Sequence, residues 1–173
     1  MIFDFIHIKL MKHFIYISFV FFLFAGISCT NDETCRKDRY VAIHAGFYTI
    51  KTDTLGIHSR ATLTIDSITI QGLDSIGQLV DSVLYNKKKT GEIYLPLHKF
   101  KTQSRFMVSL NDTIDTLTIL HTNYDQYLSL ECGCIKTHSI DTVLTTNHFI
   151  DSILINNHDI NTIDAEHIQI YHN

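Results

Sequence analysis

Histidine is the residue type in this sequence with the most obvious capacity for chemistry. The chain has 11 histidines, and four of them, His148, His158, His167 and His172, lie near its C-terminal end. Imidazole nitrogens bind metals such as zinc and copper, so this group raises the hypothesis of a metal or small-ligand carrier. However, His167 and His172 differ by an odd number of positions, so on one strand they would face opposite sides. We therefore predict solvated histidines and no metal site, with the carrier as the alternative.

The sequence lacks the motifs of the common enzyme classes. It contains no Gly-x-Ser-x-Gly, no His-Glu-x-x-His, no phosphate-cradling glycine-rich loop and no calcium-binding Asp-x-Asp-x-Asp-Gly loop. Serines, cysteines, histidines and acids are present, but their spacing selects no catalytic set. We therefore predict no enzymatic activity and no cofactor. A hydrolase of envelope glycans is a lesser alternative, and it would need two carboxylates about 5–9.5 Å apart in a cleft.

Cys29 ends a segment that differs from the rest of the chain. Lys12 and His13 precede an apolar run at 14–24, and mostly small residues follow at 25–28. This order has the anatomy of a secretory signal, and its end resembles a bacterial lipoprotein box. The apolar run is shorter than the roughly 20 apolar residues that a membrane-spanning helix needs.

We therefore predict a signal peptide at 1–28, for which Met11 is a better start than Met1, and a lipidated Cys29 as the mature N-terminus. Acyl chains on this cysteine would embed in a membrane leaflet and gain about 0.8 kcal/mol per buried CH₂. An ordinary signal peptide cut nearby and an uncleaved anchor are the alternatives.

An acidic stretch, Thr-Asn-Asp-Glu at 30–33, comes directly after Cys29. It resembles the signal that some Gram-negative gut bacteria use to send lipoproteins to the cell surface, although a merely soluble tether explains it equally well. We expect an outer-membrane lipoprotein of the cell envelope, joined to its membrane by a tether at 29–38.

Three further cysteines remain, Cys35, Cys132 and Cys134. Exported proteins keep disulfides, and three cysteines allow one bridge with one thiol left over. Cys132 and Cys134 are two positions apart, so on a strand they would share a face and a bridge between them would be strained. A Cys35–Cys132 bond would pin the tether to the domain. A metal site on Cys132, Cys134 and a histidine is the lesser alternative, because Cys-x-Cys without a second close pair is a weak zinc signature.

Composition favours one folded domain that does not bind nucleic acid. The chain has 18 acidic and 14 basic residues, a net charge of −4, so the basic excess that a phosphate backbone requires is missing. Its 45% hydrophobic content excludes polar low-complexity disorder. We expect a single domain at 39–173, which is long enough to bury a self-sufficient core.

Alternation of apolar and polar residues predicts about nine strands in this domain. The predicted strands lie at 41–47, 62–66, 92–97, 105–110, 114–120, 127–132, 140–145, 149–155 and 167–171. Their regular spacing is typical of an all-β antiparallel sandwich, immunoglobulin-like or similar, rather than of βαβ units.

The segment 73–84 fits two structures. Its apolar residues match a helical stripe, but Gly72 and Gly77 interrupt it. We predict a loop followed by a strand at 82–85, which forms a hairpin with 92–97 through a turn at 86–91.

The tripeptide Asp-[Ser/Thr]-[Ile/Leu/Val] recurs at irregular spacing. Its copies start at Asp53, Asp66, Asp74, Asp81, Asp112, Asp115, Asp141 and Asp151. Asp and Ser/Thr side chains bond nearby backbone N–H groups, so turn formation is the simple explanation. The tripeptide also resembles the O-glycosylation acceptor of some envelope-exporting gut anaerobes. Ser75 and Thr113, both in predicted loops, are the candidate acceptors.

Several motifs in one order carry a family resemblance. They are Cys35, Phe47-Tyr48, Asp53-Thr-Leu55, Ile68-Thr-Ile-Gln-Gly72, Ile93-Tyr-Leu-Pro-Leu97, Asp115-Thr-Leu-Thr-Ile119, Glu131-Cys-Gly133, Ile150-Asp-Ser-Ile153 and His167-Ile-Gln-Ile170. Over about 35–172 the chain resembles a family of small uncharacterised lipoproteins, with a domain of unknown function, from Gram-negative gut anaerobes. The resemblance implies an all-β envelope domain and supports pairing Cys35 with Cys132, but it brings no activity.

Taken together, these features favour a lipid-anchored β-sandwich that acts as a binding or structural accessory module. We expect the membrane to be its first partner, through the lipid on Cys29, and an envelope protein or glycan to be its second. The carrier built on C-terminal histidines is the alternative from a different functional class.

Overall fold

The computed structural model describes residues 40–130 and 132–172. The chain divides into two compact units, Met1–Arg36 and Lys37–Asn173, and the described residues all belong to the second. The predicted signal peptide, the lipidated Cys29, the tether and Cys35 lie outside the described residues, so they stay predictions. No helix long and apolar enough to cross a membrane occurs within the described ranges.

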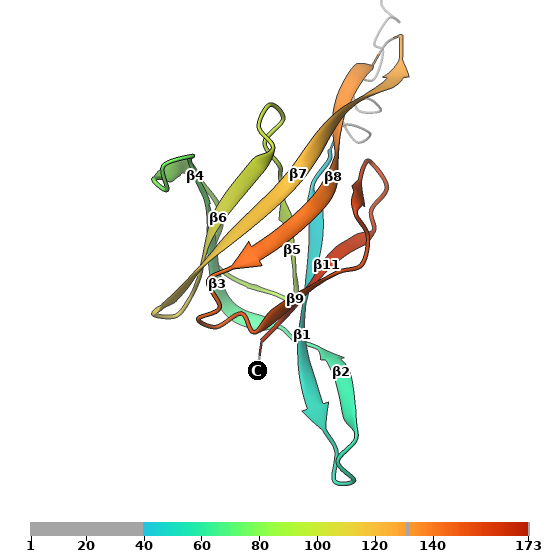
Figure 1. Cartoon of the computed structure of the whole chain (residues 1–173). Coiled ribbons are helices and arrows are strands. Elements are labelled where there is room, and N and C mark those ends of the chain that lie inside the picture. The colour runs from blue at the N-terminus through green and yellow to red at the C-terminus, as the bar shows by residue number, and fades with distance from the viewer. Residues whose placement is uncertain (1–39, 131, 173) are drawn as a thin grey trace, which may run out of the picture. The chain divides into compact units, whose positions relative to one another are not determined.

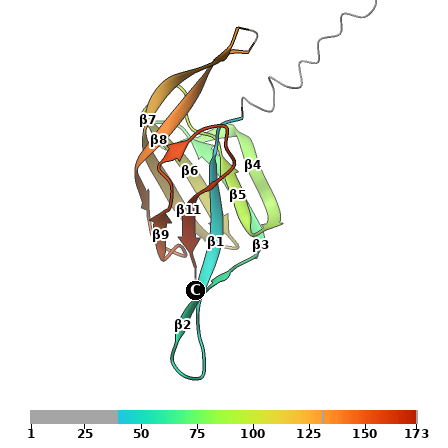
Figure 2. The ribbon, with the colours of Figure 1, turned by 90° about the vertical axis from the view of Figure 1, so that its right-hand side faces the viewer.

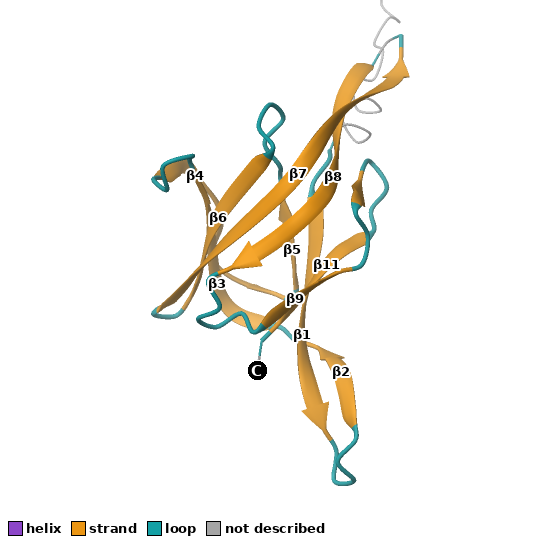
Figure 3. Cartoon of the chain, viewed as in Figure 1, coloured by secondary structure: helices purple, strands orange, loops and turns teal. Residues whose placement is uncertain are grey.

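The described elements are all strands, and they form two sheets (Figures 1 and 3). The five strands of the first sheet are β1 (Ile43–Thr52), β2 (His58–Thr62), β5 (Glu92–Leu95), β9 (Ser152–Ile155) and β11 (Glu166–Tyr171). β1 pairs in parallel with β11, and antiparallel with β5 along its first half and β2 along its second. Figure 2 shows β1 between β5 and β11.

The second sheet has six strands in the order β10-β8-β7-β6-β3-β4. They are β3 (Ile65–Leu73), β4 (Leu79–Thr90), β6 (Gln103–Leu110), β7 (Thr113–Ser129), β8 (Gly133–Thr145) and β10 (Asp159–Ile160). All its pairings are antiparallel. The far ends of β7 and β8 extend beyond the packed part of the sheets (Figure 1).

Alternation directs one face of each sheet into a shared core. In β1, Ile43, Ala45 and Phe47 are buried and belong to the same cluster as Leu117 and Ile119 of β7. Each fully buried Ile, Leu or Phe side chain of this cluster contributes about 1.5–3 kcal/mol. The predicted all-β sandwich is therefore confirmed, with eleven strands among the described residues instead of about nine.

The predicted hairpin between 82–85 and 92–97 is wrong. β4 continues through the predicted turn to Thr90 and pairs with β3, whereas β5 starts at Glu92 and pairs with β1. The chain therefore passes from one sheet to the other at Gly91. Lys87, with φ of 46°, lies in β4, where the register with β3 is irregular. The predicted strand at 127–132 is also not separate, because its first residues end β7.

Two copies of the recurrent tripeptide form the same kind of turn. Asp53 Oδ1 accepts backbone N–H bonds from the residues two and four positions later, both at 2.8 Å, and Asp74 Oδ1 does the same at 2.9 and 2.8 Å. Each turn has a glycine with positive φ three residues after the aspartate, Gly56 or Gly77. The local explanation of the tripeptide holds at these two hairpin loops.

Candidate functional site

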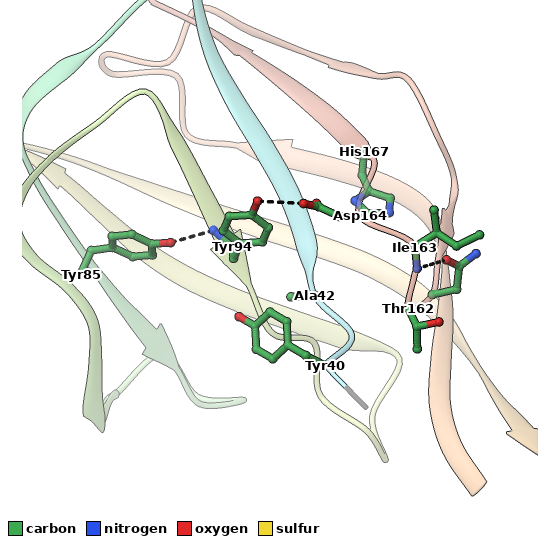
Figure 4. A pocket seen from close by; sticks show the side chains of 9 residues that line it. Tyr40, Ala42, Tyr85, Tyr94, Thr162, Ile163, Asp164 and His167 are labelled. Atoms are coloured by element: carbon green, nitrogen blue, oxygen red, sulfur yellow. Dashed lines mark hydrogen bonds between the residues drawn. The ribbon is translucent and has the colours of Figure 1, made fainter. Parts of the chain in front are cut away.

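A pocket of about 450 Å³ lies where the first sheet meets β4 of the second (Figure 4). Nine residues line it: Tyr40, Ala42, Tyr85, Tyr94, Asn161, Thr162, Ile163, Asp164 and His167. They come from the residues before β1, from β4, β5 and β11, and from the loop that joins β10 to β11. Its volume is within the range of ligand-binding clefts, and three of its nine lining residues are tyrosines.

Hydrogen bonds hold two of these tyrosines. The Tyr85 hydroxyl accepts the backbone N–H of Tyr94 at 2.8 Å, and this bond joins β4 of the second sheet to β5 of the first. The Tyr94 hydroxyl donates to Asp164 Oδ2 at 3.4 Å (Figure 4). The Tyr94 ring stacks on His44, with 4.6 Å between the ring centroids. Burial and the nearby carboxylates of Asp164 and Glu92 raise the pKa of Tyr94, so it stays a neutral hydroxyl.

His44 links two carboxylates behind the Tyr94 ring. Its Nδ1 lies 3.1 Å from Asp164 Oδ1 and its Nε2 lies 3.1 Å from Glu92 Oε2. Asp164 is the only carboxylate among the described residues that line the pocket. The pocket lining therefore lacks the pair of carboxylates that the glycan-hydrolase alternative requires.

His167 forms part of the pocket wall but is itself buried. Its Nδ1 accepts the backbone N–H of His44 at 3.0 Å, and its Nε2 meets no hydrogen-bond partner within the described residues. Burial lowers its pKa, and the nearby backbone of Asp159 offsets only part of this effect. His167 is therefore a neutral side chain.

A polar network covers the outer face of the first sheet beside the pocket. The Tyr48 hydroxyl donates to Glu166 Oε2 at 2.5 Å, and Gln169 Nε2 donates to Glu166 Oε1 at 2.6 Å. Arg60 donates to Gln169 at 2.8 Å and lies over the Tyr48 ring. Gly46 leaves the room for this carboxylate, because a Cβ there would lie 2.5 Å from Glu166 Oε2. These groups satisfy one another and orient β11.

A second polar group lies buried at the edge of the core. Ser104 Oγ accepts the backbone N–H of His98 at 2.8 Å and lies 2.9 Å from His121 Nε2, while His121 Nδ1 lies 2.9 Å from Asn123 Oδ1. Asn123 Nδ2 donates to backbone carbonyls of the 98–101 loop, so its Oδ1 accepts from both His121 and His138. Each histidine therefore carries its proton on Nδ1.

This buried group has the layout of a Ser–His–Asn nucleophile but not its accessibility. Ser104 is 7% exposed and His121 is fully buried. Its hydrogen bonds connect the 98–101 loop to β7 and β8, which explains why polar residues occupy inward positions. Burial lowers the pKa of His121 and His138, so both rings remain neutral members of a structural network.

The C-terminal histidines do not come together. His148 bonds Asp115, His158 Nδ1 donates to the Ile140 carbonyl at 2.6 Å, and His172 Nδ1 donates to the Phe149 carbonyl at 2.8 Å. No group of three metal-ligating side chains occurs in the described part of the chain. The expectation of solvated histidines is wrong for His121, His138 and His167, which are buried.

The other predicted site residues lie apart from the pocket. Cys132 and Cys134 flank the start of β8, and Cys134 carries an exposed free thiol. The Cys35–Cys132 bridge stays a prediction because Cys35 is outside the described residues. Ser75 is exposed in the β3–β4 loop, where its Oγ accepts from Lys101 at 2.8 Å, and Thr113 is exposed at the start of β7. Glycosylation at these two sites stays a prediction.

Sequence reasoning missed the pocket because its signal is dispersed. Tyr85 and Tyr94 lie on either side of the predicted hairpin turn, and Asn161–Asp164 matches no known motif. Tyrosines dispersed along a sequence more often contribute to packing than to a binding site. The crossing from β4 to β5 brings Tyr85 and Tyr94 together, and the β10–β11 loop adds Asn161–Asp164.

Comparisons with known proteins identify one relationship. The sequence model of a family of unknown function (DUF6452) matches residues 67–172, more than half of the chain. This span includes every lining residue of the pocket except Tyr40 and Ala42. No curated protein and no solved structure matches the chain.

Proposed function

Since the chain belongs to this family of unknown function, we propose its role from its own sequence and geometry: a lipid-anchored β-sandwich of the cell envelope that acts as a binding module. The observation that carries the proposal is the tyrosine-lined pocket, which combines aromatic rings with convergent polar groups. Sites that bind small ligands have this composition. The module is non-catalytic in this proposal, which the burial of Ser104 and the single carboxylate of the pocket support.

The pocket is the part of the proposal that binding experiments test. Three classes of small molecule would be titrated into the purified domain: uncharged sugars, organic cations and inorganic anions. We expect one class to perturb the amide signals of Tyr94 and of Asn161–Asp164 in nuclear magnetic resonance spectra. If all three classes leave these signals unchanged, the pocket is not a binding site and the proposed function fails.

The lipid anchor is tested by changing Cys29. In membrane fractions of the native host, the wild-type chain is expected to sediment with the membranes and the Cys29→Ala variant is expected to be soluble. The physical reason is that removal of the acyl chains removes their partition into the bilayer. A Cys134→Ala variant serves as the matched control and should stay with the membranes. Sedimentation of the Cys29→Ala variant would show that no lipid on Cys29 is required.

The intact mass of the native protein tests the remaining covalent predictions. We expect a chain that starts at Cys29 and carries acyl groups, with one disulfide between Cys35 and Cys132. Hexose increments that map to Ser75 or Thr113 would establish the predicted O-glycosylation.

A further inference from the structure

We propose that the tyrosine-lined pocket binds an uncharged saccharide, with a sugar ring against the tyrosines and its hydroxyls on Asn161, Thr162 and Asp164. This inference rests on the proposed function and assigns the class of ligand. Three properties of the lining carry it: its aromatic surface, its mixture of hydrogen-bond donors and acceptors, and its charge.

The aromatic surface suits a ligand with one apolar face. Tyr40, Tyr85 and Tyr94 surround the pocket from three different segments (Figure 4). Tyr40 is 60% exposed, so part of its surface is open to a ligand from solvent. A sugar ring presents a face of C–H groups, which can lie against such rings while its hydroxyls stay hydrated or bonded.

The polar groups of the β10–β11 loop include both donors and acceptors. Asn161 Oδ1 accepts the backbone N–H of Ile163 at 2.8 Å, which directs the amide oxygen into the loop and leaves the NH₂ group to donate elsewhere. Thr162 adds a hydroxyl, and Asp164 adds carboxylate oxygens. A sugar hydroxyl both donates and accepts, so an array of hydroxyls can satisfy all three residues.

The charge of the pocket lining favours an uncharged sugar over inorganic anions and organic cations. Among the described residues, the lining contains Asp164 but no lysine or arginine, which disfavours phosphates and carboxylates. An organic cation could use the rings and Asp164, but it would leave the donors of Asn161 unsatisfied. Lys88 Nζ also lies 5.2 Å from the centre of the Tyr85 ring, so a second cation at this ring would be repelled, whereas an uncharged sugar would not.

The test compares binding of glucose, galactose, N-acetylglucosamine, maltose and lactose with binding of tetramethylammonium and of inorganic phosphate. The readouts are amide chemical shifts and tyrosine emission, which is usable because the chain has no tryptophan. We expect at least one of the sugars to bind, with shifts at Asn161–Asp164 and Tyr94, and no binding of phosphate.

Two pairs of variants place the sugar in this pocket. Asn161→Asp keeps the oxygen that caps Ile163 but replaces the NH₂ donor by a charge, so sugar affinity is expected to fall at least about tenfold, because a hydrogen bond is lost and an acceptor is left facing the ligand. Tyr40→Ala should weaken binding by about tenfold through loss of the aromatic contact, whereas Tyr40→Phe should not. Tyr124→Ala, at an exposed tyrosine of β7, is the control that should leave affinity unchanged.

Each contrary result has its own meaning. If tetramethylammonium binds, binds more tightly to Asn161→Asp and no sugar binds, the pocket is a binding site for cations and the saccharide assignment is overturned. If a sugar binds equally well to wild type, Asn161→Asp and Tyr40→Ala, the site lies elsewhere and the inference is also overturned. If no probe of any class binds, the proposed function itself fails.

Discussion

Replacement of Asp115 by alanine is expected to lower the free energy of unfolding by about 4 kcal/mol, because several buried donors then lose their acceptor at once. The Asp115 side chain is fully buried. Its carboxylate accepts the Thr146 hydroxyl at 2.6 Å and the backbone N–H groups of His148, Phe149 and Ile150 at 2.8–2.9 Å. These bonds fix the chain between β8 and β9 onto the start of β7.

The pH dependence of the free energy of unfolding should also show the contribution of Asp115. Burial alone raises the pKa of Asp115, but the hydrogen bonds from Thr146 and the three backbone N–H groups outweigh it and bring the pKa from 3.8 to about 2. The folded state therefore binds protons less readily than the unfolded state. The stabilising effect of the Asp115 carboxylate is complete above about pH 4 and is lost as the pH falls through about 2. The loss amounts to about 2.5 kcal/mol.

Urea denaturation of the purified domain measures the effect, and the chain supplies a matched control. Asp81 begins another copy of the same tripeptide but lies exposed on β4. Asp81→Ala is expected to change the free energy of unfolding by no more than about 0.5 kcal/mol. Equal effects of Asp115→Ala and Asp81→Ala would contradict the structural role given to Asp115.

The second large effect is acid destabilisation through His138. Burial, followed by the nearby charges of His121, Lys136 and Lys99, lowers the pKa of His138 from 6.5 to about 4. Because the folded state holds this ring neutral, stability is complete above pH 6.5 and is lost as the pH falls towards 4. The shift corresponds to about 3 kcal/mol.

The His138→Asn variant separates this titration from loss of the hydrogen bond. An asparagine amide can place its nitrogen near the position of Nδ1 and so keep the donor to Asn123 Oδ1, which lies 2.7 Å away in the wild type. Between pH 7 and pH 4, the free energy of unfolding of this variant should fall by about 3 kcal/mol less than that of the wild type. His121 and His167 will preserve some acid sensitivity, because burial lowers their pKa too.

His58, exposed on β2, provides the comparison for this experiment. The His58→Asn variant is expected to follow the pH profile of the wild type. If His138→Asn follows it as well, protonation of His138 does not drive acid unfolding.

The sandwich could be predicted from the sequence because alternation is a local consequence of burying one face of a strand. Ile43, Ala45 and Phe47 repeat at every second position and are all buried, as expected. The partner of each strand could not be predicted in the same way. Alternation at 92–97 indicates a strand, but it does not indicate that this strand joins β1 in the other sheet rather than β4.

The recurrent tripeptide shows the same division. At Asp53 and Asp74 the aspartate caps its own turn, and backbone atoms within four residues account for the structure. The copy at Asp115 has the same local sequence, yet its carboxylate bonds residues more than thirty positions away. The turn-forming hydrogen bonds could be predicted from the sequence. The long-range hydrogen bonds of Asp115 could not, because they depend on the packing of β7 against the β8–β9 connection.

Two features could be predicted from the sequence alone: a cysteine after a signal-like segment, and a succession of strands from Ile43 onward. Both follow from composition and the two-residue period, which are properties of contiguous segments. The places where polar side chains gather depend on how the strands pack. Ser104, His121 and Asn123 meet inside, and Tyr40, Tyr94 and Asp164 meet around a pocket, although up to 124 positions separate Tyr40 from Asp164. These contacts follow from the order of the strands in the two sheets. That order is fixed by long-range packing and is not encoded in any short stretch of sequence.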